Sequence, residues 1–315
     1  MSFPKQVRIV EVGPRDGLQN EQSVSTADKI TLINMLTDAG HSYIESGAFV
    51  SPKWVPQMAD AVAVMAGISR RPGCAYSVLT PNMNGFEAAL TAKADAVAVF
   101  ASASEGFSRN NINCSIAESL DRFAPVLQAA KDAGIPVRGY VSCVTDCPYD
   151  GRVEPGAVAS VAAALDAMGC HEISLGDTLG QGTPEAIAAM LEAVCAVVPA
   201  ERLAGHFHDT AGRALLNIEA SLGFGLRVFD AAAGGLGGCP YAPGAKGNVA
   251  TEAVDAFLTD KGYRTALDRA ALEDAVSFAR ALWRQDRAAA RPVAVARGMA
   301  ADGAVAHNLH FPTAS

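Results

Sequence analysis

The chain has 315 residues, of which 50% are hydrophobic and 18% are charged, and its formal net charge is −8. These values are typical of a globular protein with a large core, and the lack of a basic run argues against nucleic acid as a partner. No apolar run approaches the roughly 18 residues of a membrane span, and no signal peptide is evident, so we expect a cytoplasmic protein without a membrane partner.

The seven cysteines have irregular spacing, which indicates reduced thiols rather than a disulfide framework. The pair Cys143-x3-Cys147 has no second cysteine pair after it, so its spacing alone is weak evidence for a structural zinc.

Eight short apolar runs alternate along the chain with longer Ala-rich segments of helical period. The predicted strands are Val7–Val12, Tyr43–Ser46, Ala75–Leu79, Ala96–Ala101, Val137–Cys143, Glu172–Leu175, Leu203–Phe207 and Val228–Ala232. The predicted helices span residues 26–39, 54–67, 82–92, 116–133, 157–169, 184–197, 211–223 and 248–260. Strict alternation favours an α/β fold in which a parallel sheet closes into a (β/α)8 TIM barrel.

An open doubly wound sheet is the alternative fold, but the turn after the first strand lacks the G-x-G-x-x-G spacing that a nucleotide-binding sheet would carry. We expect Thr26, Asn82 and Thr183 to lie at helix starts. An extra helix, Arg269–Trp283, is predicted to cover the barrel, so that residues 1–287 form one domain and residues 288–315 a poorly ordered tail.

A glycine-rich segment, Gly235–Asn248, follows the last predicted strand, and we call it the flap segment. Five glycines and two prolines among its fourteen residues argue against a helix or strand interior and predict a mobile loop over an active site. It carries a thiol, Cys239, that is suited to acid catalysis, and an amide, Asn248, that is suited to metal ligation.

Chemistry in such barrels gathers at the carboxyl ends of the strands, and His206-x-His208 ends the seventh predicted strand. Residues i and i+2 of a strand point to the same side, so both imidazoles can reach one divalent ion. The motif alone is equally compatible with two polar residues at a strand end. With Asp16 and Asn248 it makes a mixed nitrogen and oxygen set, which suits Mg2+, Mn2+ or Co2+ better than Zn2+.

Several charged residues near strand ends have two interpretations. Arg15 either forms an internal ion pair or stabilises a developing enolate oxygen. Glu45 and Asp177 either orient a ligand or pair with neighbouring cationic side chains. Glu252 is placed to hold the end of the flap segment, and for His41 we expect a surface or capping role.

Six motifs carry a resemblance to the hydroxymethylglutaryl-CoA lyases, within the metal-dependent pyruvate-carboxyltransferase-like barrels, from about residue 7 to about residue 285. They are Val10-Glu-Val-Gly-Pro-Arg-Asp-Gly-Leu-Gln-Asn-Glu21, Phe49-Val-Ser-Pro-Lys-Trp-Val-Pro-Gln57, Asn111-Ile-Asn-Cys-Ser115, Glu172-Ile-Ser-Leu-Gly-Asp-Thr178, Gly205-His-x-His-Asp-Thr210 and Gly235-Leu-Gly-Gly-Cys-Pro-Tyr241. The Arg-Asp-Gly and His-x-His pieces are common to the superfamily, whereas the Gly-Gly-Cys-Pro-Tyr and Ser-Pro-Lys-Trp-Val-Pro-Gln pieces are more specific to the lyases.

The resemblance implies cleavage of an acyl-CoA thioester, (S)-3-hydroxy-3-methylglutaryl-CoA, to acetyl-CoA and acetoacetate in leucine degradation. It implies a bound Mg2+ or Mn2+, with Co2+ also suitable, no organic cofactor, and a homodimer. The implied site has catalytic residues Arg15, Asp16, His206 and Cys239, metal ligands Asp16, His206, His208 and Asn248, and supporting residues Gln19, Glu45, Tyr140, Asp177 and Glu252. Either Asp16 or His206 would serve as the base.

One departure from the family pattern follows Glu45, where Ser46-Gly47-Ala48 replaces a segment that usually carries more hydroxyl groups. A smaller, more apolar wall would admit a substrate with a C3 substituent larger than methyl. A second alternative is a Claisen condensing enzyme of the same superfamily, which the lyase-type flap segment disfavours. A barrel that only binds a CoA ester or a metal is disfavoured by the complete ligand set.

Overall fold

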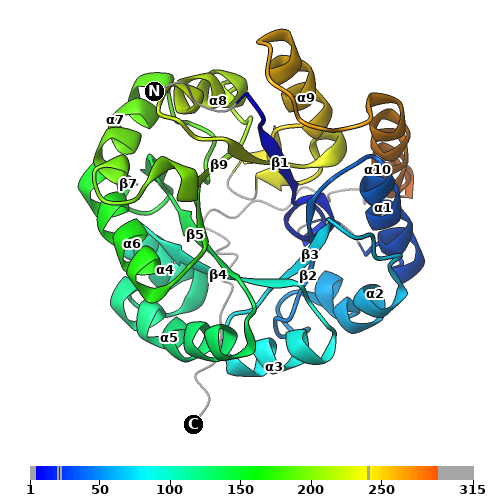
Figure 1. Ribbon diagram of the computed structural model, residues 1–315, viewed down its shortest axis with the longest axis horizontal. Helices are drawn as coiled ribbons and strands as arrows, with labels where there is room; N and C mark the ends of the chain where they lie inside the picture. Colours follow the sequence, from blue (N-terminus) through cyan, green and yellow to red (C-terminus); the bar gives the residue numbers. More distant parts are fainter. Residues whose placement is uncertain (1–4, 20, 22, 240–241, 290–315) are drawn as a thin grey trace, which may run out of the picture.

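The computed structural model describes residues 5–19, 21, 23–239 and 242–289. In this part of the chain, eight parallel strands close into a barrel in the order β1-β10-β9-β8-β5-β4-β3-β2 (Figure 1). The barrel strands are β1 (Arg8–Glu11), β2 (Tyr43–Ala48), β3 (Ala75–Leu79), β4 (Ala96–Ser102), β5 (Val137–Ser142), β8 (Glu172–Asp177), β9 (Leu203–Phe207) and β10 (Val228–Ala231). The predicted (β/α)8 barrel is confirmed, and each predicted strand overlaps one barrel strand.

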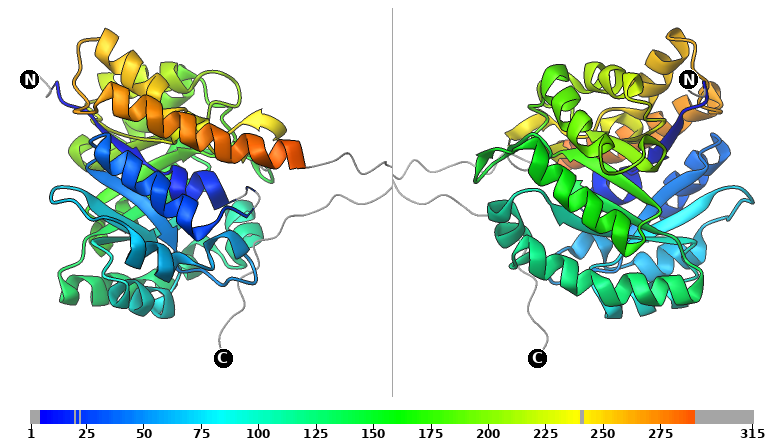
Figure 2. Two further views of the ribbon diagram at one scale, coloured as in Figure 1. Left: turned by 90° about the vertical axis from the view of Figure 1, so that its right-hand side faces the viewer. Right: turned by 60° about the vertical axis from the view of Figure 1, so that its left-hand side comes forward.

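Helices form a ring around the barrel (Figure 1). They are α1 (Thr26–Asp38), α2 (Ala61–Gly67), α3 (Met83–Thr91), α4 (Glu105–Ile112), α5 (Ile116–Ala133), α6 (Pro155–Met168), α7 (Pro184–Cys195), α8 (Ala214–Gly223), α9 (Thr251–Asp260) and α10 (Arg269–Ala289). The predicted extra helix is α10, which lies along α1 (Figure 2) and runs past the predicted domain boundary at residue 287. From residue 290 onward, the predicted tail lies outside the described residues. Among the helices described here, none has the length and apolar character that a bilayer crossing requires.

All three residues predicted at helix starts lie there, two of them as N-caps and Thr26 as the first helical residue of α1. The side chains of Asn82 and Thr183 accept hydrogen bonds from backbone N–H groups in the first turns of α3 and α7. In α1, which begins at Thr26, the cap is Ser25, because the Ser25 hydroxyl accepts the hydrogen bond from the N–H of Asp28. These caps satisfy N–H groups that have no partner within the helix.

Short elements that the sequence analysis did not predict follow several strands. After β1, a π-helical turn, η1 (Gly13–Gly17), carries Arg15 and Asp16, and the N–H groups of Asp16 and Gly17 both donate to the carbonyl of Val12. The helix α4 is also absent from the predicted helices. The other short elements are η2 (Pro56–Met58), a hairpin of β6 (Asp146–Cys147) and β7 (Gly151–Arg152), η3 (Ala200–Arg202) and η4 (Ala233–Gly235).

The flap segment contains an antiparallel pair, β11 (Gly238–Cys239) and β12 (Ala242–Lys246), so the prediction that its composition excludes strands was wrong. A two-stranded ribbon needs few backbone hydrogen bonds, and an edge position tolerates glycine and proline. The glycines also allow a close approach at its base. A Cβ atom at Gly247 would lie 2.3 Å from the carbonyl oxygen of Gly237. Any residue other than glycine would therefore clash at this position.

The barrel interior is charged rather than uniformly apolar, whereas the apolar core lies between the strands and the helices. Arg138 of β5 is fully buried, and its guanidinium donates to Glu172 of β8 (Nε–Oε1 2.8 Å) and to Asp230 of β10 (NH2–Oδ1 2.7 Å). Glu172 is also paired with Arg8 of β1. Buried charges are tolerated because each has a hydrogen-bonded partner of opposite sign.

Glu11, the last residue of β1, links three segments from a fully buried position. Its Oε1 atom accepts hydrogen bonds from the N–H groups of Gly13 and Ala233, both at 2.9 Å, and its Oε2 atom accepts from the Thr251 hydroxyl at 2.7 Å. One carboxyl group therefore fastens β1 and η1 to η4, where the flap segment begins, and to the start of α9.

His41 lies against Glu11, and the expectation of a surface or capping role was wrong. The imidazole is buried, with Nδ1 3.4 Å from the carbonyl oxygen of Ile9 and Nε2 3.7 Å from Oε2 of Glu11. Burial lowers the pKa of His41 to about 4, so the ring is neutral at pH 7. Burial also raises the pKa of Glu11 to about 7, against the three hydrogen bonds that it accepts. A proton on Glu11 gives the otherwise unpartnered Nε2 of His41 a donor to face.

We predict that Glu11 makes stability fall as pH rises. The pKa of Glu11 is about 7 in the folded protein and 4.5 ordinarily, so between these values the folded protein holds a proton that the unfolded chain has released. The free energy of unfolding should therefore fall with pH across this window, by up to about 1.4 kcal/mol per pH unit. Glu11→Gln, which keeps a neutral side chain of the same shape, should lack this contribution.

Urea unfolding of the wild type and of Glu11→Gln at pH 5, 6, 7 and 8 measures the difference directly. Glu87→Gln, on the exposed side of α3, serves as the control and should run parallel to the wild type. Parallel curves for Glu11→Gln and the wild type would contradict the raised pKa of Glu11 in the folded protein.

Candidate active site and metal centre

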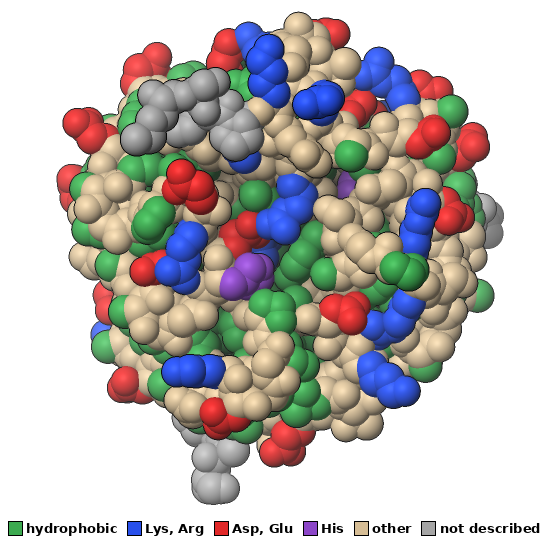
Figure 3. All heavy atoms as spheres, in the orientation of Figure 1, with side chains coloured by type: hydrophobic (Ala, Val, Ile, Leu, Met, Phe, Trp, Pro, Cys, Tyr) green, Lys and Arg blue, Asp and Glu red, His purple; other side chains and the backbone are tan. Residues whose placement is uncertain are grey.

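The predicted ligands Asp16, His206 and His208 form one cluster at the barrel mouth, with one ligand atom of each within 4.8 Å of the others. Asp16 comes from η1 after β1, whereas His206 lies in β9 and His208 directly follows it. Acidic, basic and histidine side chains meet in a hollow at the centre of the molecule's face (Figure 3). The closed barrel thus brings together residues that are about 190 positions apart in the chain.

The protonation states of His208 and Asp16 suit a divalent cation, whereas burial would lower the pKa of His206 but the contact with Asp230 outweighs it and raises that pKa. Burial lowers the pKa of His208 to about 4, so this ring is neutral at pH 7. Burial would raise the pKa of Asp16, but the charges of Arg15 and of the two histidines outweigh it and lower that pKa, which keeps the carboxylate ionised. Metal ligands must be deprotonated in this way before they can bind.

Hydrogen bonding also leaves ring nitrogens available to a metal. The Nδ1 atom of His206 lies 3.1 Å from Oδ2 of Asp230, so Nε2 is the nitrogen of that ring that can bind a metal. The Nδ1 atom of His208 is buried and has no hydrogen-bond partner among the described residues, while the backbone of Thr178 engages this side chain. A buried ring nitrogen without a partner is unfavourable unless a ligand satisfies it, so the cluster fits a bound ion.

Asn248, the fourth predicted ligand, lies beside Asp16. Its side-chain nitrogen donates to Oδ2 of Asp16 at 2.8 Å and to the carbonyl of Leu236 at 3.2 Å. Its backbone pairs with that of His208. Because the amide nitrogen is engaged twice, the amide oxygen is the atom that remains for a cation.

Arg15 forms the internal ion pair that was one of its two predicted roles. Its guanidinium donates to Oε2 of Glu45 (Nε 2.7 Å) and to Oδ1 of Asp16 (NH1 2.9 Å), and it lies over the Tyr140 ring at 5.6 Å. The second Glu45 oxygen is buried, and no residue in the described part of the chain forms a hydrogen bond with it. Burial raises the pKa of Glu45, with Arg15 opposing the shift. The pairing holds the Arg15 cation rigidly, and it is compatible with a second role toward an anionic substrate oxygen.

Tyr140 of β5 lies between Arg15 and His206. Its hydroxyl is 3.3 Å from Oε2 of Glu45 and accepts a hydrogen bond from Arg138 at 2.8 Å. Its ring meets that of His206 edge-on, with centroids 6.3 Å apart. Burial raises the pKa of Tyr140 well above its ordinary value, so the hydroxyl remains neutral.

The remaining predicted residues lie around the cluster. Asp177 binds the Thr145 hydroxyl (3.1 Å) and the N–H of Gly182 (2.9 Å), which fixes the loop after β8. Glu252 accepts from the N–H of Gly234 in η4 (3.0 Å) and from Arg280 (2.8 Å).

Gln19 and Cys239 are the two other residues that were predicted for the site. Gln19 is half-buried just after η1. The backbone of Cys239 belongs to β11, but its side chain lies outside the described residues, so its predicted role as an acid stays a prediction.

Arg138, Glu172 and Asp230 are buried neighbours of the site to which the sequence analysis assigned no role. Asp230 contacts His206 directly, and Arg138 contacts Asp230. A signal was present, because Asp230 interrupts the apolar run Val228–Ala231, and a charge in such a run must be paired if it is buried. Nothing in the sequence names the partner, which comes from another strand.

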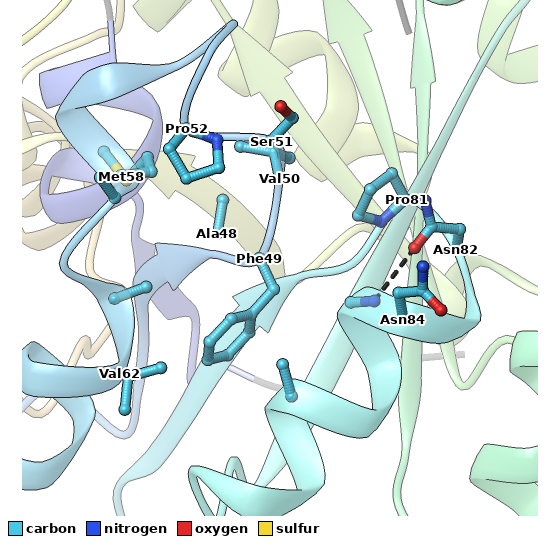
Figure 4. A pocket seen from close by; sticks show the side chains of 14 residues that line it. Ala48, Phe49, Val50, Ser51, Pro52, Met58, Val62, Pro81, Asn82 and Asn84 are labelled. Carbon is cyan, nitrogen blue, oxygen red and sulfur yellow. Dashed lines mark hydrogen bonds between the residues drawn. The ribbon is translucent and has the colours of Figure 1, made fainter. Parts of the chain in front are cut away.

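A separate cavity of about 470 Å³ opens between the segment after β2 and the start of α3 (Figure 4). Its lining includes Ala48, Phe49, Met58 and Pro81 and contains no charged or histidine side chain. A Cβ atom at Gly47 would lie 3.3 Å from the Cβ of Ala61 in α2. Part of the small-residue segment Ser46–Ala48 therefore faces α2 and this apolar cavity, which lacks the groups that the chemistry needs.

Comparison with known proteins relates this chain to one family of lyases. The HMGL-like family model matches residues 6–278. A Pseudomonas aeruginosa protein named 3-hydroxy-3-isohexenylglutaryl-CoA/hydroxymethylglutaryl-CoA lyase is 60% identical over 276 residues, covering 87% of this chain and 92% of its own length. Mitochondrial hydroxymethylglutaryl-CoA lyase of Bos taurus is 56% identical over 278 residues, covering 88% of this chain and 86% of its own length.

Two solved structures extend the similarity to three dimensions. The HMG-CoA lyase of Brucella melitensis superposes with a TM-score of 0.88 at 61% identity, covering 89% of this chain and 99% of that one. An HMG-CoA lyase of Acinetobacter baumannii in complex with coenzyme A and 3-methylmalate superposes with a TM-score of 0.85 at 34% identity, covering 95% of this chain and 100% of that one.

Proposed function

The chain belongs to the HMGL-like family, and from this membership we propose that it is a hydroxymethylglutaryl-CoA lyase. The reaction cleaves (S)-3-hydroxy-3-methylglutaryl-CoA to acetyl-CoA and acetoacetate. The observation that carries the proposal is the cluster of Asp16, His206 and His208 beside Arg15, in a chain 56% to 60% identical to proteins with this name.

Asp16, His206, His208 and Asn248 are proposed to hold a divalent cation, with Mg2+ or Mn2+ first and Co2+ also suited to these donors. When bound, the cation acts as a Lewis acid on substrate oxygens. No organic cofactor is needed, because the reaction only breaks one carbon–carbon bond and moves protons.

Cleavage requires a base for the C3 hydroxyl proton. As that proton leaves, C3 becomes the ketone carbon of acetoacetate, the C2–C3 bond breaks, and its electron pair passes to the thioester enolate. Ionised Asp16 and the Nε2 atom of His206 are the two groups suited to accept the proton. Both lie at the mouth, and the choice between them stays open.

Arg15 is proposed to stabilise the enolate oxygen. Its guanidinium is buried and fixed by Glu45 and Asp16, so it needs little reorganisation when negative charge develops nearby. Tyr140 lines the same wall through its contact with Glu45. Charge stabilisation of this kind is most effective where water is excluded, as at this buried end of β1.

Cys239 is proposed as the acid that protonates the enolate carbon to give acetyl-CoA, on the grounds of its place in the flap segment. The base of that segment is anchored by two carboxyl groups, since Glu11 binds the N–H of Ala233 and Glu252 binds the N–H of Gly234. These anchors fix where the flap segment leaves the barrel.

The cellular setting also remains a proposal. An acyl-CoA thioester as the partner is supported by the names of the relatives and by the coenzyme A complex of the Acinetobacter baumannii protein. A homodimer, a cytoplasmic location and a place in leucine degradation stay predictions from the sequence resemblance. The Bos taurus relative is named as a mitochondrial protein.

A substrate with a larger C3 substituent is the second candidate. It is motivated by the double name of the Pseudomonas aeruginosa relative. The small residues Gly47 and Ala48 give it little support, because they face α2 and the separate apolar cavity. The methyl substrate stays first, because the other relatives that we compare are named for that substrate alone. A Claisen condensing enzyme is not favoured, since none of these relatives is named as one.

We predict that the purified protein with Mg2+ or Mn2+ releases acetyl-CoA from (S)-3-hydroxy-3-methylglutaryl-CoA and loses this activity with a chelator. A coupled assay over a panel of thioesters that differ only at C3 measures the preference, and kcat/KM should be highest for methyl. Incubation with acetyl-CoA and 2-oxo acids, which should release no CoA, is the control for condensation. No acetyl-CoA from any member of the panel would reject the proposed function.

We also predict that Cys239→Ala lowers kcat by at least about 100-fold, which is the usual size of an acid–base contribution, and leaves Mn2+ affinity unchanged. Cys74→Ala is the matched control and should retain wild-type turnover, because this half-buried thiol precedes the amino end of β3, at the end of the barrel opposite the mouth. Equal turnover by Cys239→Ala and the wild type would remove this thiol from the mechanism.

A further inference from the structure

Asp230 is a buried carboxylate adjacent to the metal cluster, and its hydrogen bonds leave it no freedom to rotate. Its Oδ1 atom accepts from NH2 of Arg138 at 2.7 Å. Its Oδ2 atom accepts from NH1 of Arg138 at 3.0 Å and from the Ser174 hydroxyl at 2.8 Å, and lies 3.1 Å from Nδ1 of His206. The side chain is fully buried, so no water competes for these positions.

The charge of Asp230 determines which group donates to His206. The Arg138 guanidinium donates to both oxygens of Asp230 and the Ser174 hydroxyl donates to Oδ2, so the geometry is that of an ionised carboxylate paired with a cation. An ionised carboxylate can only accept hydrogen bonds. The Nδ1 atom of His206 must therefore carry the proton of this contact, and Nε2 of a neutral ring then has the free lone pair.

Arg138 is itself held in place from the opposite side. Its Nε atom donates to Glu172, which also pairs with Arg8, and its NH1 atom donates to the Tyr140 hydroxyl. The register of β9 and β10 sets Asp230 directly beside His206. A continuous chain of contacts thus runs through the barrel interior from Glu172 through Arg138 and Asp230 to His206.

The two clustered histidines, His206 and His208, differ in what lies beside their Nδ1 atoms. His206 has a carboxylate against its Nδ1 atom, whereas Nδ1 of His208 has no hydrogen-bond partner. A carboxylate behind a metal-binding histidine fixes the ring orientation and makes the ligating nitrogen a better donor. Of these two histidines, therefore, only His206 has a carboxylate within hydrogen-bonding distance of its Nδ1 atom in the described part of the chain.

We propose that Asp230 is a positioning residue that fixes His206 as the Nδ1–H tautomer and so presents Nε2 to the divalent cation. The inference rests on the proposed metal site of the lyase, but it makes a claim about the metal-free protein that stands apart from activity. Arg138 supports this role, because its two hydrogen bonds to Asp230 favour the ionised carboxylate and fix its orientation.

The first test needs no substitution. Nitrogen-15 NMR of the histidine side chains in metal-free wild-type protein, recorded at a pH where the His206 ring is neutral, reports which ring nitrogen of His206 is protonated. The expected result is a protonated Nδ1 and an unprotonated Nε2. A proton on Nε2, or an equal mixture of both tautomers, would overturn the proposal whether or not the protein proves to be a lyase.

The second test compares Mn2+ affinity by electron paramagnetic resonance. The double variant Asp230→Leu, Arg138→Met removes the ion pair as a unit and leaves Glu172 paired with Arg8. It should bind Mn2+ about 10- to 100-fold more weakly and should lose the tautomer preference of His206. Ser174→Ala, which removes one other hydrogen bond to the same oxygen, is the control and should change affinity by less than about 5-fold.

Wild-type Mn2+ affinity in a folded double variant would overturn the proposal. If the double variant fails to fold, the tautomer in the wild type decides alone. Absence of lyase activity together with the expected tautomer would reject the proposed function and leave the role of Asp230 intact.

Discussion

The buried ion pair between Arg138 and Asp230 is the interaction on which the barrel interior depends. It joins β5 to β10 across the barrel, and its neighbours Glu172, Tyr140 and His206 are all placed by hydrogen bonds to it. Breaking such a pair from one side costs about 3–5 kcal/mol, because the other charge stays buried without compensation. The interior of this barrel therefore carries charge in a fixed pattern, and that pattern continues directly into the cluster at the mouth.

A second buried carboxyl group, Glu11, connects the same mouth to the flap segment. It binds the N–H groups that follow β1 and that begin η4, so the turn carrying Arg15 and Asp16 and the base of the flap segment share one anchor. At the other end of the flap segment, the side chain of Asn248 donates a hydrogen bond to Asp16. Movement of the flap segment is thus restrained at both ends by groups that also organise the proposed metal site.

Much of this arrangement could be predicted from the sequence, because strand–helix alternation and motif spacing are local properties. The barrel, the position of Asp16 beside His206 and His208, and the caps at Asn82 and Thr183 follow from such patterns. The role of Asp230, the burial of His41 and the hairpin in the flap segment did not. Each depends on a partner from a distant strand or on backbone pairing, and neither leaves a periodic signal in one sequence.

The central claim is that the groups at the barrel mouth form one binding site for a divalent cation. Anomalous X-ray diffraction from crystals grown with Mn2+ tests it most directly. We expect a single strong peak at the mouth, about 2.0–2.5 Å from a carboxylate oxygen of Asp16, Nε2 of His206, a ring nitrogen of His208 and the amide oxygen of Asn248. An empty mouth, or a peak without Asp16 or the two histidines among its ligands, would contradict the account.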